Sequence, residues 1–175
     1  NVNPLEWLLD HSLNENGMDT LFIAMLLNSD EEAVGKLLKH PRSNITLSDA
    51  GAHLTFFNDA GYGLYMLQKW VRENEIMTIE EAIYNLTGKQ ADIYRIDQRG
   101  RLVPGQYADM MLINPDKVGV SQTYRVNDLP GGSSRLNIDG HGIYGVWING
   151  QRVLEDNSIV NRESLPGKVI RGFHA

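Results

Sequence analysis

The stretch "NITLSDAGAH" (residues 44–53) joins an alternating apolar segment to a turn that carries an acid and a histidine. If the segment is extended, Ile45 and Leu47 point to one face and their polar neighbours to the other. Gly51 then allows the chain to turn sharply. Two interpretations of Asp49 follow. It caps a helix that begins in the turn, or it presents its carboxylate at the carboxyl end of a barrel strand, where barrel enzymes have their active sites. The stretch alone leaves both open.

The residues before this stretch predict a strand and a helix that belong to the same unit. "DTLFIAMLL" (19–27) is a continuous apolar run of strand length, typical of a strand covered on both faces. Ser29 and Glu32 have capping-box spacing, and the helix that follows should end at Pro41. A strand, a helix and a strand within about thirty residues predict a βαβ unit with parallel strands.

Three more helices are predicted in the first 95 residues. One is a short amphipathic helix over residues 4–13, with Pro4 in its first turn. A second, after the turn, has an apolar stripe at helical period, formed by Leu64, Leu67 and Val71. Thr78 and Glu81 repeat the capping-box spacing and predict a third helix that ends near Gly88.

From about residue 96 the helical periodicity is lost. Short apolar runs punctuated by glycine and proline replace it, which predicts β-strands. "GIYGVWINGQRVLEDNSIV" (142–160) predicts a hairpin with Asn149-Gly150 in a type I′ turn. We therefore expect residues 96–175 to contain almost no long helix.

Composition excludes several classes of function. The 175 residues include 16 basic and 22 acidic side chains, a formal charge of −6, and no Lys/Arg-rich run, so a nucleic-acid-binding surface is not expected. The longest apolar run, 21–27, is too short to span a bilayer. The chain has no cysteine, which excludes disulfides and thiolate metal sites and fits a cytoplasmic location. Because the first residue is Asn1 rather than methionine, a removed upstream signal remains an alternative.

Asp49 and His53 are the candidate site residues. No pair of the five histidines has the spacing of a local zinc site. His53 follows Asp49 by four residues and could line the same cavity to bind substrate, although an ordinary hydrogen bond in a loop explains it as well. Three arginines could bind a substrate carboxylate or could simply be surface charges: Arg42, Arg72 and Arg135.

Several motifs in their order along the chain resemble one enzyme family. They are "TLSDAGAH", "YMLQKWVRE", "TIEEAIYNLTGKQADIY", "DQRGRLVPGQYADMMLINPDKVG", "NDLPGGSSRL", "GIYGVWINGQRVL" and "LPGKVIRG". Together they resemble the carboxyl-terminal part of the N-acyl-D-amino-acid deacylases (D-aminoacylases) of the amidohydrolase superfamily. The resemblance extends from about residue 30 to 172.

The resemblance implies an α/β architecture in two parts. Residues 1–95 would supply the last β/α units of a (β/α)₈ barrel, and residues 96–175 the carboxyl-terminal strands of a small β-sandwich. Asp49 would lie at the end of the eighth barrel strand. There it would act as general acid and base, and could also bind the Zn²⁺ ion that such enzymes use to activate water.

The same resemblance implies that the chain is incomplete. A barrel needs about 250 residues, and zinc needs about four ligands, of which only Asp49 is a candidate in this sequence. We therefore expect a fragment that is inactive alone and that joins the missing amino-terminal part or self-associates. The expected substrate is an N-acyl-D-amino acid. A cyclic-amide hydrolase of the dihydropyrimidinase type and a non-catalytic binding or assembly module are the alternatives.

Overall fold

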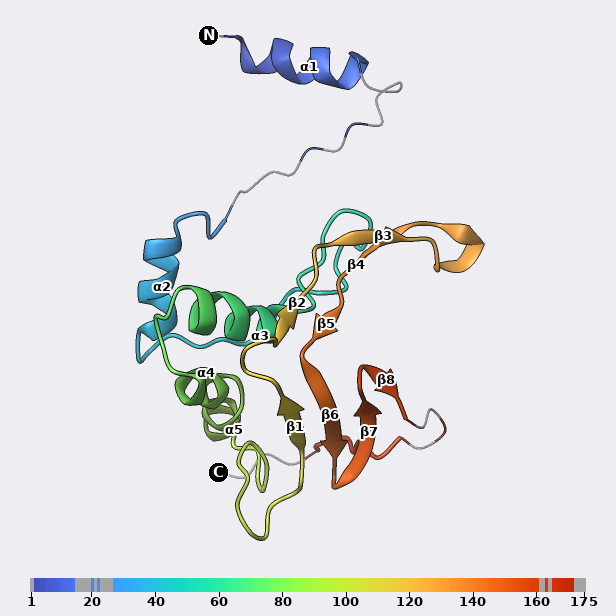
Figure 1. The fold of residues 1–175 in the computed structure, drawn as a ribbon. Coiled ribbons are helices and arrows are strands. Elements are labelled where there is room, and N and C mark those ends of the chain that lie inside the picture. Colours follow the sequence, from blue (N-terminus) through green and yellow to red (C-terminus); the bar gives the residue numbers. More distant parts are fainter. Residues whose placement is uncertain are drawn as a thin grey trace. The chain divides into compact units, whose positions relative to one another are not determined.

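The computed structural model describes residues 2–14, 20, 22, 27–160, 163 and 165–171. It divides into two compact units, Asn1–Val34 and Gly35–Ala175. The elements combine helices in the first 95 residues with strands after residue 109 (Figure 1), in agreement with the expected α/β class. None of the described helices is long and apolar enough to cross a membrane.

In the first unit, helix α1 (Pro4–Asn14) confirms the helix predicted over 4–13. Helix α2 (Glu31–Lys39) begins in this unit and continues into the second. The Asp30 carboxylate accepts the bond from the Ala33 N–H (3.0 Å), so the predicted cap at Ser29 is wrong by one residue. Most of the strand predicted over 19–27 lies outside the described residues.

A run of helices follows the Asp49 turn in the second unit. Helix α3 (Tyr62–Tyr65) continues directly into a π-helix (Met66–Glu73), and α4 (Ile79–Leu86) and α5 (Gly88–Tyr94) come next. The predicted capping box at the start of α4 is confirmed: the Thr78 hydroxyl accepts from the Glu81 N–H (3.2 Å), and the Glu81 carboxylate accepts from the Thr78 N–H (2.9 Å).

The π-helix carries much of the small core. Among the described residues, the buried apolar side chains are Met66, Leu67, Trp70, Met77, Ala82, Ala91 and Val118. Polar side chains of the π-helix bind the backbone beside Val118. The Arg72 guanidinium donates to the carbonyls of Pro115 (3.1 Å) and Val118 (2.6 Å), and the Gln68 amide oxygen accepts from the Val120 N–H (2.9 Å). The helical run and the strands are therefore joined by both apolar and polar contacts.

Within the described residues, eight strands form three antiparallel sheets. One sheet has the order β1-β6-β7-β8: β1 (Met110–Ile113), β6 (Ile143–Ile148), β7 (Gln151–Glu155) and β8 (Ser158–Ile159). Strand β2 (Gly119–Val120) pairs with β5 (Gly140–His141), and β3 (Tyr124–Val126) pairs with β4 (Arg135–Asn137). Between residues 96 and 160, all of them described, the sole helix is a 3-10 turn at Pro130–Gly132.

The predicted β6–β7 hairpin is confirmed. Ile148 pairs with Gln151, and the two turn residues, Asn149 (φ 50°) and Gly150 (φ 79°), have the positive φ angles of a type I′ turn. The short signal Asn-Gly was sufficient here because the turn type demands left-handed backbone at both positions.

The strand predicted over 44–49 does not form. These residues belong to no strand, so the described part of the chain contains no βαβ unit. Side chains take the place of a neighbouring strand. The carbonyl of Ser43 accepts from the Lys89 ammonium (2.5 Å), and the carbonyl of Ile45 accepts from the Gln90 amide (2.7 Å). The alternating apolar residues Ile45 and Leu47 therefore lie in a segment that pairs with no other described strand in this structure.

Candidate active-site turn

Asp49 lies in a tight turn and not at the start of a helix. Its backbone is left-handed (φ 56°), Gly51 is left-handed as well (φ 96°), and the Asp49 carbonyl accepts from the Ala52 N–H (3.3 Å). The Ser48 hydroxyl accepts from the Ala50 N–H (3.1 Å), which further stabilises the turn. No helix begins in the fully described stretch 50–60. The interpretation of Asp49 as a helix cap is therefore wrong.

The Asp49 side chain is exposed. In residues 27–160 and the other described positions, the structure records no hydrogen bond or ion pair of its carboxylate. Aspartate is one of the few residue types other than glycine that tolerate left-handed backbone, so it suits this turn. The turn thus presents a carboxylate that has no structural partner within the described chain.

His53 belongs to the same turn but does not bind Asp49. Its backbone is also left-handed (φ 52°), its carbonyl accepts from the N–H groups of Phe56 and Phe57, and its ring stacks on the Phe56 ring (4.9 Å between centroids). Within the described residues, no hydrogen bond joins the His53 ring to the Asp49 carboxylate. Both side chains are exposed in one segment, and a role of His53 in substrate binding stays a prediction.

Side chains from α3 and α5 hold the segment that leads into the turn. The Gln90 amide donates to the Ile45 carbonyl and exchanges two bonds with the Asn44 side chain (2.7 and 3.1 Å). The Tyr62 hydroxyl is 3.5 Å from the Thr46 carbonyl, at the limit of a hydrogen bond. Sequence reasoning missed Gln90, because a single glutamine about forty-five residues downstream carries no local signal.

The other end of the turn segment contacts the β-rich part. The Leu54 carbonyl accepts from the Leu136 N–H of β4 (2.8 Å). At Gly61 a Cβ atom would lie 2.5 Å from a methyl carbon of Val120, so only glycine allows this close approach. The Asp49 turn is therefore anchored before residue 47 and after residue 53.

The described residues do not make a metal site by themselves. No group of three or more His, Asp and Glu side chains among them is arranged to hold a metal ion. Asp49 would be one ligand of the approximately four that zinc takes. The donor set of the described chain therefore does not fit a bound zinc ion.

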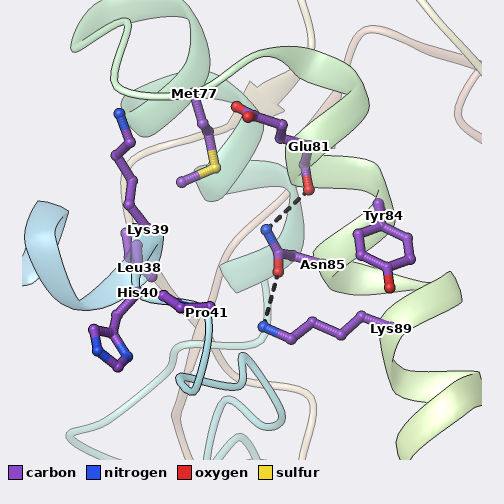
Figure 2. Close-up of a pocket in the computed structure, with 9 residues that line it drawn as sticks. All are labelled: Leu38, Lys39, His40, Pro41, Met77, Glu81, Tyr84, Asn85 and Lys89. Atoms are coloured by element: carbon purple, nitrogen blue, oxygen red, sulfur yellow. Dashed lines mark hydrogen bonds between the residues drawn. The ribbon is translucent and has the colours of Figure 1, made fainter.

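A cavity of about 320 Å³ lies elsewhere, between the end of α2 and helices α4 and α5 (Figure 2). None of its lining residues comes from the Asp49 turn. Its polar groups bind one another: the Lys89 ammonium donates to the Asn85 amide oxygen (3.2 Å), and the Asn85 amide donates to the Glu81 carbonyl (2.9 Å). Because Lys89 also binds Ser43, the cavity wall supports the segment before Asp49.

Two of the three candidate arginines are engaged in structural contacts. Arg72 binds the backbone beside β2, as described above. Arg135 forms a bidentate pair with Asp128 (2.7 Å for both bonds), and this pair holds the pKa of the Asp128 carboxyl below its ordinary value. Nothing in the structure assigns a carboxylate ligand to Arg42.

Comparison with known proteins identifies the family. A model described as "Amidohydrolase family" matches residues 2–154, most of the chain. The chain belongs to the amidohydrolase family. The match supports the expected resemblance and extends it to the first helix.

Two curated relatives are deacylases of Alcaligenes xylosoxydans xylosoxydans. The chain is 29% identical to an N-acyl-D-aspartate deacylase over 143 residues, which cover 81% of this chain and 26% of the relative. It is 28% identical to an N-acyl-D-glutamate deacylase over 152 residues, which cover 85% of this chain and 28% of the relative. The chain thus spans about a quarter of the length of these relatives.

Two solved structures also align. A D-aminoacylase is 26% identical with a TM-score of 0.46, over 59% of this chain and 20% of that chain. An N-acyl-D-glutamate deacylase of Bordetella bronchiseptica, solved with zinc and a phosphonate inhibitor, is 31% identical with a TM-score of 0.41, over 53% of this chain and 18% of that chain.

Proposed function

We propose that this chain is part of a metal-dependent hydrolase that cleaves the amide bond of N-acyl-D-amino acids, with Asp49 as general acid and base. The observation that carries the proposal is the Asp49 turn: an exposed carboxylate without a structural partner in the described chain, on a segment anchored at both ends. The family match and the two deacylase relatives support the substrate class.

The proposal includes the two-part architecture. Residues 1–95 would form the end of a (β/α)₈ barrel, and residues 96–175 would belong to a β-sandwich. The antiparallel β1-β6-β7-β8 sheet supports the second part. The first part rests on the family match, and the proposal is that segment 44–49, which belongs to no strand here, would pair with a neighbouring strand if other barrel strands were present.

The Asp49 carboxylate would first take up a proton and later release it. It takes the proton from a water molecule as the water oxygen attacks the carbonyl carbon of the substrate. It then gives this proton to the amide nitrogen as the C–N bond breaks, which leaves a carboxylic acid and a free D-amino acid. Since the described residues do not fit a zinc ion, the Zn²⁺ proposed for the complete enzyme would need further ligands, and no step is assigned to it here.

The test compares two proteins. One is the 175-residue chain alone, and the other is the full-length protein proposed here, which would contain the rest of the barrel. Each is loaded with zinc and offered N-acyl-D-aspartate, N-acyl-D-glutamate, their L-enantiomers and a dihydropyrimidine. We expect the full-length protein to release D-amino acids and to lose this activity with a chelator, and the 175-residue chain to be inactive. Turnover of the dihydropyrimidine alone would identify a cyclic-amide hydrolase, and no turnover of any substrate would indicate a binding or assembly module.

A further inference from the structure

We infer that Arg135 is a positioning residue for this reaction, because it fixes the strand that holds the Asp49 turn. The inference rests on the proposed function of Asp49. It concerns the arm, defined as β3, β4 and their connection (residues 124–137), which Figure 1 shows in orange, extending beyond the β2–β5 sheet.

The arm depends on Arg135 for its conformation. The two strands pair over only three positions, from Tyr124↔Asn137 to Val126↔Arg135, and two left-handed glycines lie in their connection. Such a short ribbon is marginally stable without side-chain support. Arg135 supplies that support by donating two parallel bonds to Asp128 (2.7 Å each), across the connection from its own strand. A bidentate arginine pair fixes both distance and orientation.

Arg135 also binds the part of β4 that contacts the turn. Its second terminal nitrogen donates to the Asn137 side chain (3.0 Å) and to the Leu136 carbonyl (3.3 Å). The Leu136 N–H, on the same residue, donates to the Leu54 carbonyl (2.8 Å). Leu54 directly follows His53 and closes the segment that begins at Asp49. One residue, Leu136, thus lies between the guanidinium and the turn.

The chain offers a matched control pair. Arg101 donates two bonds to Asp92 of α5 through its two terminal nitrogens (2.8 and 2.6 Å), whereas Arg135 uses Nε and one terminal nitrogen. In both pairs the arginine lowers the pKa of the aspartate. None of the described contacts of the Arg101–Asp92 pair reaches residues 49–57. Removing either arginine removes a bidentate ion pair, so a difference in turnover reports on the further bonds of Arg135 to β4, which lead to the turn.

The experiment uses the full-length enzyme and compares Arg135→Ala, Arg135→Lys and Arg101→Ala. We expect Arg135→Ala to lower kcat by about 10- to 100-fold with KM nearly unchanged, since small misplacement of a reacting group costs up to about a hundredfold. Arg135→Lys should recover part of the lost kcat, because lysine keeps the positive charge but cannot donate two parallel hydrogen bonds to one carboxylate. Arg101→Ala should leave kcat within about twofold of the wild type, because an exposed ion pair contributes little to stability and this pair has no described contact with the turn.

Hydrogen exchange supplies a second readout that does not depend on activity. Arg135→Ala should speed exchange at Leu136 and across residues 49–57, and Arg101→Ala should not. Equal kcat values for Arg135→Ala and Arg101→Ala, or unchanged exchange in the turn, would overturn the inference. If Asp49→Asn keeps normal turnover, the proposed function fails first and the inference with it. If Asp49→Asn is inactive and Arg135→Ala behaves like Arg101→Ala, the inference alone fails.

Discussion

At the scale of the residue, the proposed function makes Asp49 the acid–base residue. Asparagine is nearly isosteric with aspartate and keeps the left-handed turn, since both residue types tolerate this backbone. It cannot take up and return a proton. In the full-length enzyme, Asp49→Asn should therefore lower kcat by about a thousandfold or more while KM changes little.

The comparison variant is His53→Ala, which removes the stacking on Phe56 and leaves the carboxylate in place. Its kcat should stay within about tenfold of the wild type, below the range of a lost acid–base group. Steady-state kinetics on N-acyl-D-aspartate measures both variants. Near-normal turnover of Asp49→Asn with zinc bound would show that Asp49 is not the acid–base residue.

The ion pairs of Asp92 and Asp128 predict how the stability of the folded chain depends on pH. The arginine bonded to each carboxyl lowers its pKa in the folded chain, so the folded state holds the charged form more firmly than the unfolded state does. The stabilisation is complete above the ordinary aspartate pKa of about 4 and is lost as the pH falls through the lowered value. Urea unfolding should find Asp92→Asn and Asp128→Asn less stable than the wild type at pH 7. This difference should shrink below about pH 4, and a difference that grows toward acid would contradict the assignment.

At the scale of the element, Gln90 of α5 is one of the side chains that hold the segment before Asp49. Gln90→Ala removes the donor to the Ile45 carbonyl and the paired bonds to Asn44. Because these bonds are exposed or half-buried, their loss should lower stability by about 0.5–1.5 kcal/mol, and amide exchange should rise at residues 43–47. Gln122→Ala is the control, since the structure records no side-chain hydrogen bond of Gln122 among the described residues and its side chain is exposed. Equal stability of the two variants would show that Gln90 does not hold the segment.

The elements also show where sequence reasoning succeeds. The capping box at Thr78 and the Asn149-Gly150 hairpin were predicted because each signal lies within four residues of chain. The helix over this segment was predicted but its π form was not. Its side chains bind backbone more than forty residues away: Gln68 accepts from the Val120 N–H, and Arg72 donates to the Val118 carbonyl. For the same reason the sequence indicated the Asp49 turn but neither its anchors, Gln90 and Leu136, nor the absence of a strand at 44–49.

At the scale of the whole molecule, apolar surface is the dominant feature. Leu47 is 72% exposed and Phe56 is 69% exposed, both beside the Asp49 turn, and Leu37 on α2 is 60% exposed. Large exposed apolar side chains of this kind favour association when a partner covers them. Light scattering of the purified 175-residue chain should report oligomers that grow with concentration, and Leu47→Glu should reduce them. A stable monomer at high concentration would contradict this expectation.

The tip of the β6–β7 hairpin has a further consequence for the ageing of the protein. Asn-Gly sequences readily lose the side-chain amide of asparagine, because the backbone nitrogen of the glycine can attack the side-chain carbonyl carbon of the asparagine. Here the Gly150 N–H donates to the Ala108 carbonyl (2.9 Å), and the Asn149 side chain binds both Arg99 and the Pro166 carbonyl. The reacting groups are occupied as long as the tip stays folded. Deamidation at Asn149, followed by mass spectrometry of stored samples, should therefore record how often this hairpin opens.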